Sequence, residues 1–125
     1  MATKYRVELQ IVLEPVGQPW VSVVANGQNK TQQLTQPTEF NFNFAVEQGT
    51  CNLTVHHFDK TDNDPSTAVI IKSISFFGIE DLRFVWAGVY RPDYPAHYPD
   101  KIPEISSTTY LGWNGIWQLN FDVPV

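Results

Sequence analysis

The chain has 125 residues, of which 42% are apolar and 17% are charged, and its formal net charge at neutral pH is −5. This length and composition predict a single domain, 1–125, with a buried core, and exclude an intrinsically disordered protein. The acidic balance without a basic patch argues against nucleic-acid and anionic-membrane partners, and no apolar run approaches the roughly 18 residues of a membrane span.

Strand-like alternation begins near the start of the chain. Residues 4–13 place apolar side chains on one face and polar ones on the other, and 20–24 predict a second strand. The dipeptide Asn26-Gly27 is a strong signal for a tight hairpin turn. The partner segment, 29–34, is mostly polar, so we expect an exposed edge strand.

Two longer patterns fill the middle of the chain. Residues 39–58 predict two strands joined by a tight turn at 47–49, and we expect them to pair as a hairpin. Cys51 lies in phase with the apolar residues of the second strand, which suits a small buried side chain better than a catalytic thiol. Residues 68–77 are apolar on both faces, which is typical of a central strand covered on both sides.

The last third of the chain gives weaker signals. Residues 82–86 predict a short strand, whereas 87–113 show no periodicity and predict a long connection, which is often functional. We expect 110–113 and Asn114-Gly115 to begin a final hairpin that ends with a strand over 117–123. About eight short strands and no helix predict an all-β, two-sheet antiparallel β-sandwich of jelly-roll type, with a closed barrel as the alternative.

An acidic segment follows the strand that ends near residue 58. Four oxygen-bearing side chains lie within six residues: Asp59, Asp62, Asn63 and Asp64. Such side chains are the ligands that Ca²⁺ prefers, although the Gly and distal Glu of an EF-hand are missing. Asp59, Asp62 and Asp64 are therefore the candidate calcium ligands. The alternative is a solvated loop whose side chains form Asx-turns.

A second candidate region is rich in tyrosine and proline. Tyrosine recurs every four residues from 90 to 98, and each is closely followed by proline, which keeps the chain extended. We expect an interaction loop formed by Tyr90, Tyr94, His97, Tyr98 and Trp113. Three roles stay open: a cap over one end of the sandwich, a protein–protein contact, or a platform for sugar stacking.

Catalysis finds little support in the sequence. His56 and His57 are neighbours on a strand and face opposite sides, so they cannot share a metal. No Gly-x-Ser-x-Gly, phosphate-binding glycine loop or His-Glu-x-x-His motif occurs. We predict a protein that is not an enzyme and has no cofactor, apart from the calcium considered above.

Two resemblances extend these expectations. The chain resembles small β-rich virion proteins of tailed phages, especially those infecting cyanobacteria, in the following runs: Lys60 to Asp64, Ala68 to Ile74, Phe77 to Ile79 and Tyr110 to Trp117. This resemblance implies a virion structural protein made in the host cytoplasm. It would be a homo-oligomeric capsid decoration protein docking on the major capsid protein, or a tail or fibre component.

The second resemblance rests on the strand pattern and the acidic segment. Together they are similar to jelly-roll carbohydrate-binding modules that depend on calcium. That similarity implies, as the alternative function, binding of a glycan such as a host polysaccharide.

Overall fold

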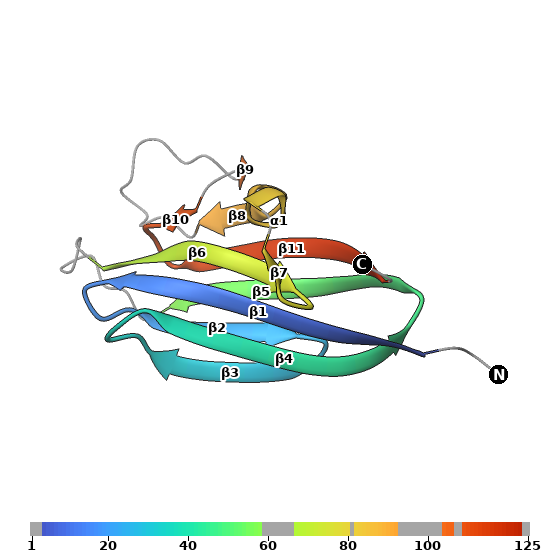
Figure 1. The fold of residues 1–125 in the computed structure, drawn as a ribbon. Coiled ribbons are helices and arrows are strands. Elements are labelled where there is room, and N and C mark those ends of the chain that lie inside the picture. The colour runs from blue at the N-terminus through green and yellow to red at the C-terminus, as the bar shows by residue number, and fades with distance from the viewer. Residues whose placement is uncertain (1–3, 59–66, 81, 93–103, 107–108, 124–125) are drawn as a thin grey trace.

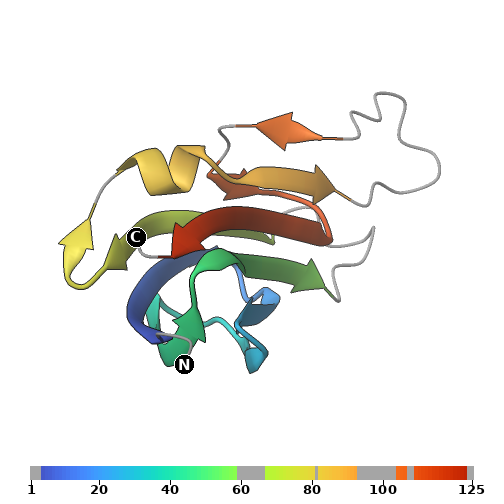
Figure 2. The ribbon, with the colours of Figure 1, turned by 90° about the vertical axis from the view of Figure 1, so that its right-hand side faces the viewer.

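The computed structural model describes residues 4–58, 67–80, 82–92, 104–106 and 109–123. These residues form eleven strands and one helix of five residues. The strands make two antiparallel sheets that pack face to face (Figures 1 and 2). The protein is therefore an all-β sandwich, as predicted from the alternating patterns.

The first sheet has the strand order β10-β6-β1-β4; β7 lies off this path and pairs with the other end of β6 from β10. It comprises β1 (Lys4–Val16), β4 (Thr38–Glu47), β6 (Ala68–Phe76), β7 (Ile79–Glu80) and β10 (Tyr110–Leu111). The second sheet has the order β3-β2-β5-β11-β8-β9. It comprises β2 (Trp20–Ala25), β3 (Gln28–Gln33), β5 (Gly49–Phe58), β8 (Val89–Pro92), β9 (Ile105–Ser106) and β11 (Gly115–Val123).

The core lies between the two sheets and is made by their inward-facing side chains. Alternate residues of β1 and β4 meet alternate residues of β2, β5 and β11, as the period of two in a strand requires. The largest fully buried side chains include Trp117, Tyr90, Phe42, Ile11 and Leu13. Each such burial contributes about 1.5–3 kcal/mol relative to an exposed side chain, so this layer is the main source of stability.

The hairpin of β2 and β3 forms as predicted. Asn26 and Gly27 have φ values of 49° and 77°, the left-handed conformation that a tight two-residue hairpin turn requires. All six residues of β3 are exposed, which confirms the prediction of a polar edge strand.

The predicted hairpin over 39–58 was right about both strands but wrong about their pairing. β4 pairs with β1 in the first sheet, whereas β5 pairs with β2 and β11 in the second. The turn at Gln48 thus carries the chain from one sheet to the other. Both arrangements bury the same alternate residues, so the local pattern cannot distinguish them.

A β-bulge explains the apolar residues on both faces of β6. The register with β1 shifts between Val12 and Leu13 and skips Lys72, which is exposed. The extra residue reverses the alternation, so the inward residues are odd-numbered before the bulge and even-numbered after it: Val69, Ile71, Ile74 and Phe76. The expectation of a strand covered on both sides is corrected to one core face interrupted by a bulge.

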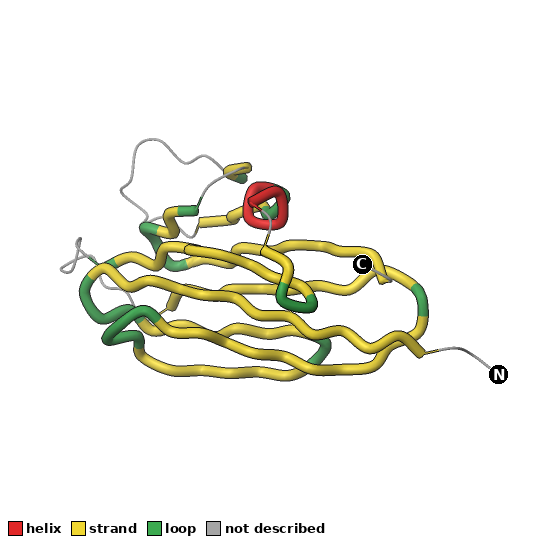
Figure 3. The backbone as a smooth tube through the Cα atoms, viewed as in Figure 1, coloured by secondary structure: helices red, strands yellow, loops and turns green. Residues whose placement is uncertain are grey.

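The end of the chain departs most from the sequence prediction. Residues 82–86 form helix α1 (Leu82–Trp86) and not a strand (Figure 3). The aromatic ring of Phe84 on α1 meets that of Phe76 edge-on at 4.8 Å, so tertiary packing overrides the β-propensity of this short segment. In the part of the chain that the structure describes, no helix has the length and hydrophobicity needed to cross a lipid bilayer.

The expected loop over 87–113 contains three short strands, β8, β9 and β10. β10 pairs with β6 in the first sheet, whereas β11 pairs with β5 and β8 in the second. The predicted hairpin between 110–113 and 117–123 is therefore absent.

Candidate functional site on the outer face of the second sheet

The acidic and tyrosine-rich segments follow two strands of the second sheet that end on the same side of it. Six of the predicted site residues lie outside the described residues, and their roles stay predictions: Asp59, Asp62, Asp64, Tyr94, His97 and Tyr98. β5 ends at Phe58 and β8 ends at Pro92, directly before these two segments. Both strands run antiparallel to β11, where Gly115 faces His57 on one side and Pro92 on the other.

Tyr90 is a core residue and not part of an exposed loop. Its side chain is 2% exposed, on β8 of the second sheet. Its hydroxyl donates to the carbonyl oxygen of Trp113 and accepts from the backbone N–H of the same residue at 3.1 Å. This corrects the inclusion of Tyr90 in the expected interaction loop, because its ring is buried; instead, it ties β8 to the segment before β11. Trp113 itself is half-buried.

The adjacent histidines face opposite sides of β5, as their spacing predicted. His57 is fully buried, and its Nδ1 lies 3.0 Å from the carbonyl oxygen of Leu111. Because Leu111 belongs to the first sheet, this contact joins the two sheets. His56 is exposed on the outer face of the second sheet.

Three rings gather on that outer face, and we call Trp20, Phe58 and His56 the ring cluster. Trp20 on β2 is the cross-strand partner of Phe58 on β5, and their ring centroids lie 6.1 Å apart. His56 lies 5.5 Å from Phe58, again between ring centroids. Trp20 is 37% exposed, so part of its indole is available to a ligand.

A groove of about 290 Å³ adjoins the ring cluster. It is lined by His56, Arg91, Asn114, Gly115, Ile116 and Gln118. On the strand register, Ile116 of β11 stands between His56 of β5 and Arg91 of β8, so the three residues form one row across the sheet. The groove thus combines an apolar floor with guanidinium, imidazole and carboxamide groups.

Glycine is required at one wall of this groove. A Cβ atom on Gly115 would lie 2.4 Å from the carbonyl oxygen of Arg91, a distance that real Cβ atoms do not tolerate. Its absence lets β11 and β8 approach closely and holds Arg91 beside Ile116. The Nε atom of Arg91 is in turn paired with Glu104 Oε1 at 3.1 Å, which balances the charge of the guanidinium.

Such a surface suits a ligand with apolar faces and many hydroxyl groups. Flat rings pack against apolar ligand faces, while guanidinium and carboxamide groups form hydrogen bonds at fixed angles. Sequence reasoning missed the ring cluster and placed the aromatic surface elsewhere. The available signal was Trp20 itself, because it alternates with the inward valines of β2 and must point outward.

Metal binding finds no support in the described ranges. Among those residues, no group of three or more histidine, cysteine, aspartate or glutamate side chains could hold a metal ion. Cys51 is half-buried against the core, and desolvation by burial raises the pKa of its thiol. This thiol is therefore a packing group, as the sequence suggested.

Comparison with known proteins gives a likeness at the level of fold. No family model matches the chain, and no curated protein matches it significantly. The solved structure of vCBM60 in complex with galactobiose is similar, with a TM-score of 0.60 and 17% identity over 91% of this chain and 99% of that chain. A selenomethionine form of vCBM60, described with two families of calcium-dependent carbohydrate-binding modules, has a TM-score of 0.60 and 16% identity over 90% of this chain and 89% of that chain.

These structures share the β-sandwich fold with this chain. The predicted similarity to carbohydrate-binding modules is confirmed for the fold, and neither structure points to a virion protein.

Proposed function

We propose that the chain is a carbohydrate-binding module whose ligand lies across the ring cluster and the adjoining groove. The observation that carries this proposal is the placing of an exposed indole and two further rings beside a groove with hydrogen-bonding walls. The similar fold of vCBM60, solved with galactobiose, supports the same class of ligand. The proposed role is binding, and we assign no catalytic step.

The charge of the groove favours a neutral glycan. Arg91 is paired with Glu104, and the chain carries a net charge of −5. A uronic-acid polymer would therefore meet overall repulsion, and among the described residues that line the groove no unpaired lysine or arginine offsets it. A neutral sugar needs only ring stacking and hydrogen bonds to its hydroxyl groups, which Trp20 and Gln118 can supply.

Calcium is a separate part of this proposal. Dependence on calcium is a property of the modules described with the similar structure, and the described residues of this chain give no cation site. The candidate ligands are Asp59, Asp62 and Asp64, as predicted from the sequence. Glycan binding through the ring cluster does not require that prediction to hold.

The test compares two exposed tryptophans. Trp20→Ala should weaken binding of a neutral polysaccharide about five- to ten-fold, because a lost stacking contact is worth about 1–1.4 kcal/mol. The control is Trp86→Ala, which removes a 53% exposed indole on α1, away from the ring cluster. Affinity electrophoresis and calorimetry with galactan, xylan and mannan measure both. Equal effects of the two variants, or no retention of the wild type on any polymer, would refute the proposal.

The virion role stays a prediction from resemblance. No observation on the described residues favours docking on a major capsid protein, a homo-oligomer or a location in the virion. A particle surface protein can also contact host glycan, so glycan binding and a virion role are compatible. The copy number in purified particles, measured against the coat protein, distinguishes a free module from a virion component.

A further inference from the structure

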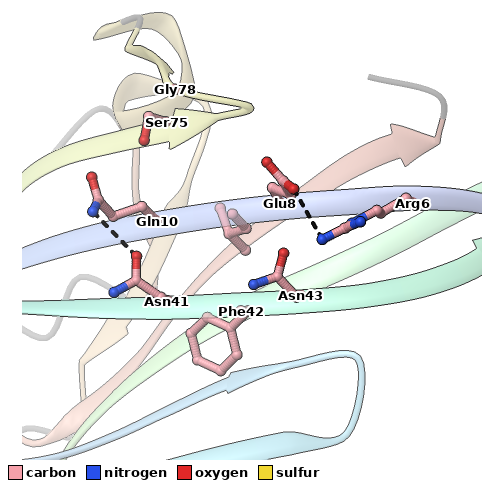
Figure 4. Close-up of a pocket in the computed structure, with 9 residues that line it drawn as sticks. Arg6, Glu8, Gln10, Asn41, Phe42, Asn43, Ser75 and Gly78 are labelled. Carbon is pink, nitrogen blue, oxygen red and sulfur yellow. Dashed lines mark hydrogen bonds and ion pairs between the residues drawn. The ribbon is translucent and has the colours of Figure 1, made fainter.

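We propose that the outer face of the first sheet is a second glycan-binding surface, so that one module can hold two polysaccharide chains at once. The class of ligand rests on the proposed function, whereas the surface rests on separate observations. It is a groove of about 310 Å³ across β6, β1 and β4 (Figure 4). The outward-facing residues that line it include Arg6, Glu8, Gln10, Asn41, Asn43 and Ser75.

This groove offers hydrogen-bonding groups and little net charge. The side-chain amide of Gln10 donates to Asn41 Oδ1 at 3.1 Å, which fixes both carboxamides across two strands. The Arg6 guanidinium and the Glu8 carboxylate lie 3.2 Å apart and offset each other. The side chains of Asn43 and Ser75 have no hydrogen-bond partner among the described residues. Each sugar hydroxyl donates and accepts, so a neutral row of carboxamide and hydroxyl groups is complementary to it.

The asparagines of β4 have low β-propensity, so a sheet face that contacted only solvent would not be expected to contain them. Asparagine is depleted in strands, where threonine fits the pleated surface better. Asn41 and Asn43 alternate with the inward phenylalanines of β4, so core packing does not require them. Asn41 has a cross-strand hydrogen bond with Gln10, whereas the side chain of Asn43 has none among the described residues. Positions that break a local preference without a structural reason are expected to be functional.

The turn at one side of the groove contains a second residue whose backbone conformation is unfavourable for its type. Phe77 and Gly78 connect β6 to β7, and Gly78 lines the groove. Phe77 has a φ of 55° and is 45% exposed, an unusual combination for a bulky aromatic residue. At the first position of the β2–β3 turn the same chain uses Asn26, with a φ of 49°. Retaining an exposed ring in this strained conformation favours a binding role for Phe77.

The two surfaces lie on opposite faces of the sandwich. The ring cluster belongs to the outer face of the second sheet, and the carboxamide groove to the outer face of the first. Packed sheets are about 10 Å apart, and the filled core separates them, so the two surfaces can hold two separate chains. A module of this kind cross-links polysaccharide instead of only adhering to it.

The first experiment isolates the second surface in the Trp20→Ala background. Trp20→Ala should retain weak binding to galactan, and adding Asn43→Thr and Phe77→Asn should abolish it. Threonine is favoured over asparagine in a strand, and asparagine is favoured over phenylalanine at a positive φ. The thermal midpoint should therefore stay the same or rise. Loss of binding together with unchanged or increased stability excludes unfolding as the cause.

The second experiment measures bridging by the whole chain. The wild type should raise the hydrodynamic radius of dilute soluble galactan, whereas Trp20→Ala and Asn43→Thr/Phe77→Asn should each bind without raising it. If Trp20→Ala removes all binding, the second surface is refuted and the proposed function stands. If only Asn43→Thr/Phe77→Asn removes binding, one site exists and bridging is refuted. If the wild type binds no polysaccharide, both proposals fail.

Discussion

The ammonium group of Lys30 lies 5.0 Å from the ring centroid of Phe42 and donates a hydrogen bond to the carbonyl oxygen of Asn41. Gln28 makes the matching contact two residues away, where its side-chain amide donates to the carbonyl oxygen of Asn43 at 2.9 Å. Side chains of β3, the edge of the second sheet, thus satisfy backbone groups of β4, the edge of the first. This arrangement protects an edge that would otherwise be open to pairing with another chain.

Replacing Lys30 should therefore weaken the molecule and expose this edge. We expect Lys30→Ala to lower the free energy of unfolding by about 1 kcal/mol, because a cation–π contact and a charge-assisted hydrogen bond are lost. Urea denaturation measures the change. Lys72→Ala is the control, since its exposed ion pair with Glu14, at 3.5 Å, contributes little. Greater aggregation on heating for Lys30→Ala alone would support protection of the edge; identical behaviour of both variants would contradict it.

A steric prediction concerns Gly88, which lies against the buried ring of Trp117. A Cβ atom on Gly88 would lie 2.1 Å from that ring, so Gly88→Ala should destabilise the protein by about 1–3 kcal/mol. In a double-mutant cycle with Trp117→Leu, the second change should relieve part of the clash, giving non-additive effects. Ala87→Ser, at the exposed neighbouring position, should be nearly neutral. Additive effects in the cycle would show that the destabilisation does not come from a clash with Trp117.

The thiol of Cys51 should react slowly in the native state. Burial raises its pKa, so the reactive thiolate is scarcer at neutral pH than in an unfolded chain. Because the folded state disfavours the thiolate, any stability linked to this group is present at neutral pH and is lost as the pH rises through the raised pKa. Labelling with a thiol reagent should be slower without urea than with it, and should accelerate on raising the pH. Equal native and denatured rates would show that the thiol is freely accessible.

The calcium prediction has its own measurement. If Asp59, Asp62 and Asp64 hold Ca²⁺, adding calcium should raise the thermal midpoint, with about 2.7 kcal/mol of stabilisation at a hundred-fold excess over Kd. A chelator should reverse the shift, and Asp62→Asn should reduce it. Magnesium at the same concentration controls for ionic strength. If the thermal midpoint changes neither with calcium nor with chelator, the prediction that these residues bind calcium is wrong.

The sequence predicted the strands better than their partners. Alternation located β1, β2, β4, β5 and β11, because a period of two directly reports one buried face. It could not report that β4 and β5 belong to different sheets, since pairing depends on which distant strand is available. The bulge at Lys72 was hidden for the same reason: one extra residue resembles burial on both faces until the partner strand is known. The helix at 82–86 depends on packing of Phe84 that no local pattern contains.

The candidate site shows a similar limit. Tyr90 was singled out for its repeat with proline, yet it is buried, because position on β8 and not residue type decides exposure. The ring cluster joins residues 20 and 56–58, which become neighbours only when β2 pairs with β5. Outward alternation identifies Trp20 as exposed, but the convergence of three rings requires the sheet order.

The place of β11 between β5 and β8 has a consequence for biosynthesis. Gly115–Val123 supplies the middle of the second sheet, so neither β5 nor β8 can complete its pairing before this segment leaves the ribosome. Until then, the apolar faces of the earlier strands stay exposed in the nascent chain, because their final partner strand is missing. Pairings between strands distant in sequence are also slow to form. Truncation within 115–123 should therefore leave a ribosome-bound chain that is sensitive to protease and recruits chaperones, whereas release of the whole segment should allow the fold to close in a single step.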